Sequence, residues 1–385
     1  MRITAIDTYI VGNPWKNWLF ARVSTDEGLH GIGEGTLNFF TRTVETAIHE
    51  LKPFILGLDP FQVETISQRL IRDVYGDGAQ IHMCAVAAVE IALWDIIGKA
   101  CNQPLYNLWG GRCHEKLRAY ANGWYRGPRT PENFAERARE VAARGYTALK
   151  FDPFGSAWRT LPRYDFDLSM DIVRAVRDAV GPTVDLLIEG HSRFNVPAAI
   201  EVARALEPFR PGWFEEPVHH SSVDAMVEVA RRSPVPIATG ESFSSKQQFA
   251  ELLKHEVVGI LQPEPLTMGG LFPVRKVCDM IDAHFGMVAP HSAQSPVSSA
   301  ACVQLNASLP NFLIHETFDE FNEPWVEEIV SHPVRVENGY IPIPDRPGLG
   351  IDLNLEQIAK YPYRQENYLP LFKPGWERRE RQRES

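Results

Sequence analysis

Three glutamates recur at a constant interval along the chain. Glu189, Glu215 and Glu241 are 26 residues apart, and each follows a short apolar run of the kind that forms a buried strand. A strand, a helix and two turns together need about that length. Residues that recur once per strand and helix, always at the carboxyl end of the strand, meet at one mouth of a (β/α)₈ barrel, where enzymes of that fold place their chemistry.

The chemistry suited to three converging carboxylates is the binding of a hard cation. No paired cysteines or histidines at zinc spacing accompany them, and clustered oxygen ligands suit Mg²⁺. Carboxylates packed together without a cation are also costly, because each disfavours the charge of the others. We therefore predict a magnesium site at Glu189, Glu215 and Glu241.

The same interval continues with residues that could move a proton. Glu264 follows Glu241 after 23 residues, and His291 follows after another 27, so their side chains should occupy neighbouring strand ends. An imidazole held by a carboxylate has a fixed tautomer and raised basicity, which is the usual arrangement of a general base. We predict a dyad of His291 and Glu264.

Four more polar residues are expected at the same mouth. His191, two residues beyond Glu189, is a second acid or base candidate. Lys150 ends an earlier strand and could neutralise a bound carboxylate or act as a base, and Asp152 follows it on the same side. Glu316 ends the eighth expected strand, where it can hydrogen-bond a substrate oxygen.

The elements that would position these residues alternate regularly. From residue 117 to 318, strand and helix patterns alternate until eight strands are complete, which predicts a (β/α)₈ barrel; no GxGxxG follows the first strand, which argues against a dinucleotide-binding sheet. Residues 1–116 show an antiparallel meander and then helical periodicity, which predicts an α+β capping domain. Residues 319–385 return to short strands and turns and should pack on that domain. The best-marked helices are expected at 43–55, 84–99, 132–144, 167–180 and 197–207, and the first three barrel strands at 117–125, 147–151 and 183–189.

Composition excludes several classes of function. The formal net charge of −10 over 385 residues argues against a nucleic-acid or anionic membrane surface. No apolar run is expected to approach the length of a membrane span, and the first residues lack a signal peptide pattern, so we expect a cytoplasmic protein without a membrane partner. The five cysteines are scattered and are expected to be reduced.

The site residues and their neighbours resemble a known family, the mandelate racemase branch of the enolase superfamily. The matching barrel motifs are Lys150, Glu189, Glu215-Glu216-Pro217, Gly240-Glu241, Gln262-Pro263-Glu264, Gly269-Gly270, His291 and His315-Glu316. The run from Ala92 to Lys99, followed by Pro104 and Leu108-Trp109-Gly110-Gly111, is similar to the N-terminal capping domain of that branch. The resemblance covers essentially the whole chain, and it implies Mg²⁺ and an enediolate formed by a Lys or His base.

Within this branch, two motifs resemble the acid-sugar dehydratases. Racemases of the family carry Lys-x-Lys where this chain has Lys150-Phe151-Asp152, and Glu189-Gly190-His191 is similar to the Asp-x-His of galactonate dehydratase-like enzymes. The resemblance implies His291, backed by Glu264, as base and His191 as acid, with the roles reversed for a substrate of opposite configuration. The chain departs from the family at Glu189 and Glu264, where Asp is common.

Specificity should come from N-terminal loops that cover the mouth. The segments 13–18 and 75–80 contain glycines, aromatic residues and polar groups suited to a mobile lid. We expect substrate contacts from Trp18, Tyr75 and Asp77, and from Asp152 in the barrel.

The function expected from these residues is the Mg²⁺-dependent dehydration of a sugar acid to a 2-keto-3-deoxy sugar acid. The substrate would be a galactonate- or gluconate-like aldonate or an aldarate, and the enzyme a homo-oligomer. An epimerase, a racemase or a sugar-lactone cycloisomerase would use the same enediolate. A non-catalytic barrel that binds a metal or a sugar acid is the alternative of another class.

Overall fold

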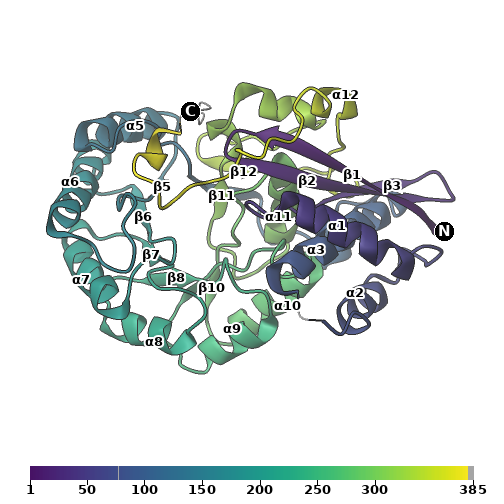
Figure 1. Cartoon of the computed structure of the whole chain (residues 1–385), viewed down its shortest axis with the longest axis horizontal. Coiled ribbons are helices and arrows are strands. Elements are labelled where there is room, and N and C mark those ends of the chain that lie inside the picture. Colours follow the sequence, from purple (N-terminus) through teal and green to yellow (C-terminus); the bar gives the residue numbers. More distant parts are fainter. Residues whose placement is uncertain (77, 380–385) are drawn as a thin grey trace.

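The computed structural model describes residues 1–76 and 78–379 of the chain. These residues form a small antiparallel sheet with its helices beside a ring of parallel strands surrounded by helices (Figure 1). The polar residues singled out above lie at one end of that ring.

The N-terminal segment forms an antiparallel sheet covered by helices, as predicted. Its strands are β1 (Ile3–Asn13), β2 (Lys16–Thr25) and β3 (His30–Glu34), in the order β1-β2-β3. Its helices are α1 (Thr41–Leu51), the 3₁₀ helix η1 (Lys52–Phe54), α2 (Val63–Arg72), α3 (Ala79–Ala100) and α4 (Leu105–Leu108). The helices expected at 43–55 and 84–99 are α1 and α3, which both begin earlier than the periodicity indicated.

Strand β3 lies directly against helix α3, and glycine makes this approach possible. A Cβ atom added at Gly33 would be 2.1 Å from the carbonyl oxygen of Ala88, a backbone atom that cannot move without displacing the helix. The sequence His30-Gly31-Ile32-Gly33 is therefore a packing surface as well as a strand.

We expect Gly33→Ala to destabilise the protein by about 1–3 kcal/mol, the usual cost of overpacking a core. The measurement is the thermal unfolding midpoint, followed by circular dichroism. Gly259→Ala is the matched control, because a Cβ there meets no atom within 4 Å. Equal midpoints for the two variants would contradict the proposed close approach.

Helix α3 is apolar on nearly every side. Its length and hydropathy would suffice for a membrane span, but 78% of its most apolar window is buried inside the structure. The sequence analysis expected no such stretch, and α3 corrects that expectation. A helix that is hydrophobic all round belongs in the core of a protein, and α3 packs against β3, α1 and α2.

One charged residue of α3 joins the N-terminal segment to the barrel. The Glu90 carboxylate accepts hydrogen bonds from the backbone N–H groups of Leu271 (2.8 Å) and Phe272 (2.9 Å), which open helix α10 (Leu271–Asp282). Burial raises the pKa of Glu90 to about 7, although these hydrogen bonds lower it. The two parts of the chain are therefore held in a defined orientation by a buried polar contact.

The barrel has eight parallel strands, as predicted. They are β4 (Lys116–Ala121), β5 (Ala148–Phe151), β6 (Asp185–Glu189), β7 (Trp213–Glu215), β8 (Ile237–Thr239), β9 (Ile260–Leu261), β10 (Met287–Val288) and β11 (His315–Thr317). Pairing runs β10-β9-β8-β7-β6-β5-β4-β11. A parallel bridge between Val288 and Phe312, just before β11, joins the two ends of this series. The sheet is thus closed on itself.

Helices surround the barrel and short elements complete it. The main helices are α5 (Pro131–Ala143), α6 (Arg163–Val180), α7 (Val196–Leu206), α8 (Val223–Arg232), α9 (Lys246–Leu253), α10 and α11 (Pro296–Ala307). The remaining elements are η2 (Glu207–Phe209), η3 (Asp319–Phe321), η4 (Pro324–Ile329), β12 (Tyr340–Pro342), α12 (Leu355–Ile358) and η5 (Trp376–Arg378). Strand β12 pairs antiparallel with β4, so the C-terminal segment also contacts the barrel.

The interior of the barrel is filled by side chains from its strands. The inner cluster consists of Tyr120, Ala148, Leu187, Trp213, Ala238, Ala289 and Ile314. Neighbouring strand residues such as Leu186 and Ile188 belong instead to the large core beneath the helices. Both faces of most strands are buried, which is why these strands are continuous apolar runs in the sequence.

The strands are shorter than the sequence predicted. The first was expected to reach residue 125, but β4 ends at Ala121 because the chain turns at Gly123, whose φ is +83°. The residues beyond β4 therefore form a loop at the barrel mouth. The division of the chain at residues 116 and 318 stays a prediction.

A segment near the C-terminus, residues 360–379, crosses from the antiparallel sheet to the mouth of the barrel; we call it the C-terminal strap (yellow in Figure 1). At its start, the carbonyl oxygen of Tyr361 accepts a hydrogen bond from Gly12 N–H (2.8 Å). Further along, the Trp376 indole N–H donates to the carbonyl oxygen of Gly155 (3.1 Å) in the loop after β5. The strap therefore contacts both parts of the molecule.

Candidate active site

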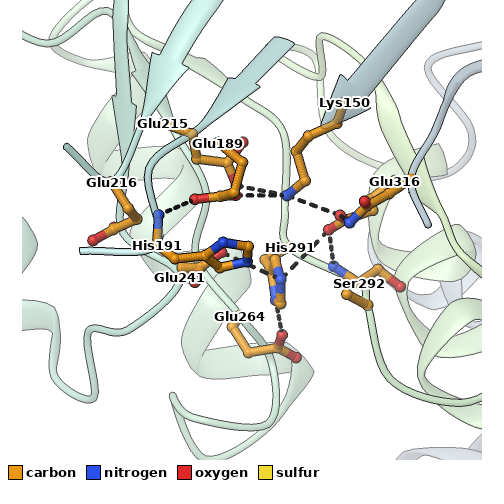
Figure 2. Close-up of polar contacts among 12 residues, drawn as sticks. Lys150, Glu189, His191, Glu215, Glu216, Glu241, Glu264, His291, Ser292 and Glu316 are labelled. Carbon is orange, nitrogen blue, oxygen red and sulfur yellow. Dashed lines mark hydrogen bonds and ion pairs between the residues drawn. The ribbon is translucent and has the colours of Figure 1, made fainter. Parts of the chain in front are cut away.

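The three evenly spaced glutamates converge, as the interval predicted. Glu189 ends β6 and Glu215 ends β7, and the two residues are paired in register. Glu241 follows β8 after Gly240, whose φ of +124° turns the chain at that point. One carboxylate oxygen from each of the three lies within 4.8 Å of the others. Figure 2 shows the three side chains pointing into one space at the ends of the strands.

The electrostatics of this cluster fit a bound cation. Burial, together with the neighbouring charge of Glu189, raises the pKa of Glu215 to about 7. Burial also raises the pKa of Glu189 and of Glu241. Glu189 Oε2 is buried and has no hydrogen-bond donor, although Lys150 Nζ lies 3.3 Å away. Hard carboxylate oxygens crowded in this way are suitable ligands for a divalent cation.

Lys150 brings a positive charge to the edge of the cluster. Its Nζ lies 2.6 Å from Glu215 Oε1 and 2.9 Å from Glu316 Oε1. Burial lowers the pKa of Lys150, but the surrounding carboxylates, Glu215 and Glu316 first, outweigh burial and raise it well above its usual value. Lys150 is therefore a fixed ammonium group, able to bind an anionic oxygen.

Glu316 is held as a carboxylate by several donors. Asn122 Nδ2 donates to its Oε1 (2.8 Å) and Ser292 N–H donates to its Oε2 (2.9 Å). Burial alone would raise the pKa of Glu316, but Lys150 and the other contacts keep it below its usual value. Glu316 is thus an ionised group in the wall of the site.

The predicted dyad of His291 and Glu264 is present. His291 Nδ1 hydrogen-bonds to Glu264 Oε2, and Nε2 lies 3.3 Å from Glu241 Oε2 (Figure 2). Burial lowers the pKa of His291, but the carboxylates of Glu241, Glu316 and Glu264 raise it to about 10. A cation held by Glu241 would offset much of this negative field and lower that pKa.

His191 forms a second pair with a carboxylate. Its backbone N–H donates to Glu189 Oε1 (2.7 Å), and its Nδ1 lies 2.7 Å from Asp152 Oδ2. Burial lowers the pKa of His191, although Asp152 acts in the opposite direction. The backbone of His191 has a φ of +47°, so the loop after β6 turns sharply and brings the ring back over the cluster.

Asp152 was predicted to contact the substrate, and that contact stays a prediction. Its carboxylate is fully buried and accepts from Arg193 Nη2 and from Phe154 N–H (2.9 Å), in addition to its contact with His191. Burial raises the pKa of Asp152, but Arg193 and His191 outweigh it and lower the pKa. An ionised carboxylate with these partners orients the His191 ring.

Of the predicted lid residues, Trp18 is buried in the core and Tyr75 is exposed. Trp18 is 0% exposed and packs in the core against Trp325, because β2 already begins at Lys16; its substrate contact stays a prediction. Tyr75 is 101% exposed on the loop before α3, so its contact stays a prediction. Asp77 lies outside the described residues.

Three residues near the site were missed by the sequence analysis. Asn122 directly follows the last residue of β4, at the same end of the barrel as the glutamates, so the strand-end interval could have identified it. Lys16, the first residue of β2, donates from Nζ to the carbonyl oxygen of Ala293 (2.9 Å), two residues beyond His291. No sequence pattern marked Arg193, because its contact with Asp152 depends on the folded loop after β6.

The fold and the residues of the site can be compared with known proteins. A family model described as mandelate racemase/muconate lactonizing enzyme, N-terminal domain, matches residues 13–110. A second model, described as enolase C-terminal domain-like, matches residues 133–358. The chain belongs to the enolase superfamily, in its mandelate racemase branch. The predicted family and the predicted barrel with an α+β cap are confirmed.

Several relatives are dehydratases. The chain is 33% identical over 382 residues to a D-gluconate/D-galactonate dehydratase of Picrophilus torridus, covering 97% of each chain. It is 35% identical over 349 residues to a D-gluconate dehydratase of Thermoproteus tenax, covering 90% of this chain and 70% of that one. A mandelate racemase/muconate lactonizing enzyme of Jannaschia sp. CCS1 has a solved structure that superposes with a TM-score of 0.89 at 34% identity, covering 94% of this chain and 98% of that chain. These relatives confirm that the chain is an enzyme of the hydro-lyase class.

Proposed function

We propose that the chain catalyses the Mg²⁺-dependent dehydration of a six-carbon sugar acid, such as gluconate or galactonate, to a 2-keto-3-deoxy sugar acid. The observation that carries this proposal is the presence of two histidines, each held by its own carboxylate, next to opposite members of the glutamate cluster. His191 adjoins Glu189, and His291 adjoins Glu241. Elimination of water needs one group to remove a proton and another to donate one.

The proposed metal ligands are Glu189, Glu215 and Glu241. Bound there, Mg²⁺ would act as a Lewis acid that lowers the free energy of negative charge on the substrate carboxylate. Lys150 would add a fixed positive charge beside Glu215. This arrangement is the kind of preorganised electrostatic environment that stabilises developing charge without reorganising during the reaction.

The proton transfers follow from the contacts of the two rings. His291 directs Nδ1 to Glu264, which leaves Nε2 to accept the proton next to the substrate carboxylate. His191 directs Nδ1 to Asp152, which leaves its Nε2 to donate a proton to the departing hydroxyl. The C–H electron pair forms the new double bond, the C–O bond breaks, and water leaves. The enol product then becomes the 2-keto acid.

The assignment of base and acid reverses for a substrate of opposite configuration. The carboxylates of Glu241, Glu316 and Glu264 raise the pKa of His291 and burial lowers the pKa of His191, which by themselves favour that reversed assignment. A bound cation would reduce the difference, because it would offset the carboxylates that act on His291. The two assignments predict different deuterium exchange in variants of each histidine.

A panel of aldonates and aldarates tests the proposed function. We expect purified chain with Mg²⁺ to convert D-gluconate or D-galactonate to a product that gives the colour reaction of 2-keto-3-deoxy acids. Exchange of the α-hydrogen with D₂O without loss of water would instead favour an epimerase or racemase. No turnover of any member of the panel would contradict the dehydratase proposal.

A further inference from the structure

The C-terminal strap borders a cavity of about 410 Å³, and none of the three clustered glutamates lines it. The cavity lies between the strap and the turn at Pro14 and Trp15. Its charged lining residues are Lys360, Arg364, Glu366, Lys373 and Arg379. Four positive groups against one negative group make this a basic surface on a chain whose net charge is −10. Such a surface attracts anions.

Arg379 differs from the other basic lining residues because it is only partly exposed, whereas Lys360, Arg364 and Lys373 are exposed. Its guanidinium carbon lies 3.4 Å from the centre of the Trp15 ring, and the rings of Tyr125 and Phe318 are also close. Nη1 donates to the carbonyl oxygen of Gly123 (2.6 Å), and Nε is buried without an acceptor. Within residues 1–76 and 78–379, no carboxylate lies within 4.0 Å of this group. A guanidinium has five N–H donors, so this partly buried group has donors left for an oxygen acceptor.

The strap contacts two loops that carry residues of the candidate site. Gly123, its hydrogen-bond partner, follows Asn122, whose amide donates to Glu316. On the same strap, the Trp376 ring lies edge-on to the His191 ring, with 6.1 Å between ring centres. The two strap residues are thus connected to the loops that carry Glu316 and His191.

We propose that Arg379 binds the oxygen-bearing end of the substrate farthest from the metal, and that Trp15 and Trp376 form the walls of this subsite. This inference rests on the proposed function. The oxygen would belong either to the terminal hydroxyl of an aldonate or to the second carboxylate of an aldarate, since both accept from a guanidinium. Arg379 would then determine the length of sugar acid that the enzyme prefers.

The test compares substrates of different length in wild type and in three variants of the strap. Arg379→Gln removes the charge, Arg379→Lys keeps it, and Arg378→Gln is the matched control, because Arg378 is exposed on the same turn. The probes are D-gluconate, D-glucarate and the four-carbon D-erythronate. Thermal unfolding of each variant checks that the fold is unchanged.

We expect Arg379→Gln to raise KM for the six-carbon acids by about 10- to 100-fold, as expected for loss of a charge-assisted hydrogen bond, with little change in kcat. KM for D-erythronate should not change, Arg379→Lys should recover part of the loss, and Arg378→Gln should behave as wild type. A larger effect on D-glucarate identifies a carboxylate as the partner, and a larger effect on D-gluconate identifies a hydroxyl. An unchanged KM, or an equal rise for the four-carbon acid, overturns the proposal.

The failure of this proposal can be distinguished from failure of the proposed function. If wild type converts the six-carbon acids and Arg379→Gln converts them equally well, only the subsite is wrong. If wild type converts none of the probes, the dehydratase proposal fails, and calorimetric titration of D-gluconate and D-glucarate into both proteins with Mg²⁺ decides the subsite. Weaker binding by Arg379→Gln than by wild type supports the subsite; equal binding, or none by wild type, overturns it.

Discussion

Replacing His291 by asparagine is expected to lower kcat for dehydration by about 10²- to 10⁴-fold, the range attributed to a general base. Asparagine cannot accept the α-proton at the position of Nε2, which lies 3.3 Å from Glu241. The effect should fall on kcat, because the proposed metal ligands and Lys150 remain in place. The measurement is steady-state kinetics with the sugar acid identified in the panel.

Deuterium exchange distinguishes the catalytic roles of His291 and His191. If His291 is the base, His291→Asn abolishes exchange of the substrate α-hydrogen with D₂O, whereas His191→Asn retains exchange and loses elimination. His284→Asn is the control, because His284 is exposed in the turn between α10 and the amino end of β10, whereas the site lies at the carboxyl ends of the strands. Exchange retained in His291→Asn and lost in His191→Asn would show that the roles are reversed.

A substitution in the glutamate cluster is expected to weaken the binding of Mg²⁺ strongly. Glu241→Gln keeps a side chain of nearly the same shape but removes one of the three negative charges that would hold Mg²⁺. Loss of an outer partner of a metal ligand already costs about 10- to 100-fold in affinity, so loss of a ligand should cost at least about 100-fold. Calorimetric titration with Mg²⁺ measures the change directly, and activity should fall with it.

A control and a chelation experiment complete this test. Glu251→Gln, on the exposed face of α9, changes the net charge equally without touching the cluster. Removal of the metal by a chelator should abolish activity, and added Mg²⁺ should restore it. Full activity in a chelated sample would contradict the metal site.

The convergence of the site could be predicted because parallel strands end at one edge of a sheet. That rule brought Glu189, Glu215 and Glu241 together, and it also placed His291 beside Glu264. The magnesium ligand set and the roles of the two histidines stay predictions. The cytoplasmic location and the homo-oligomeric state also stay predictions.

Other features could not be predicted because they depend on contacts between distant parts of the chain. The role of Asp152 became clear only with Arg193 beside it, in a loop whose left-handed backbone at His191 has no pattern in the sequence. Trp18 lies in a segment with the composition of a lid loop, and only its place in β2 shows that it belongs to the core. The C-terminal strap has no periodicity that would connect it to the barrel.

The contacts at the start of the strap have a consequence for biosynthesis. Asn17 donates to the carbonyl oxygens of Arg364 and Asn367, across 347 and 350 residues of chain. At the usual rate of translation, the later residues leave the ribosome roughly 20 to 70 seconds after the earlier ones. The barrel can therefore assemble during synthesis while its mouth is still uncovered. The mouth of the barrel is completed only after nearly the whole chain has emerged.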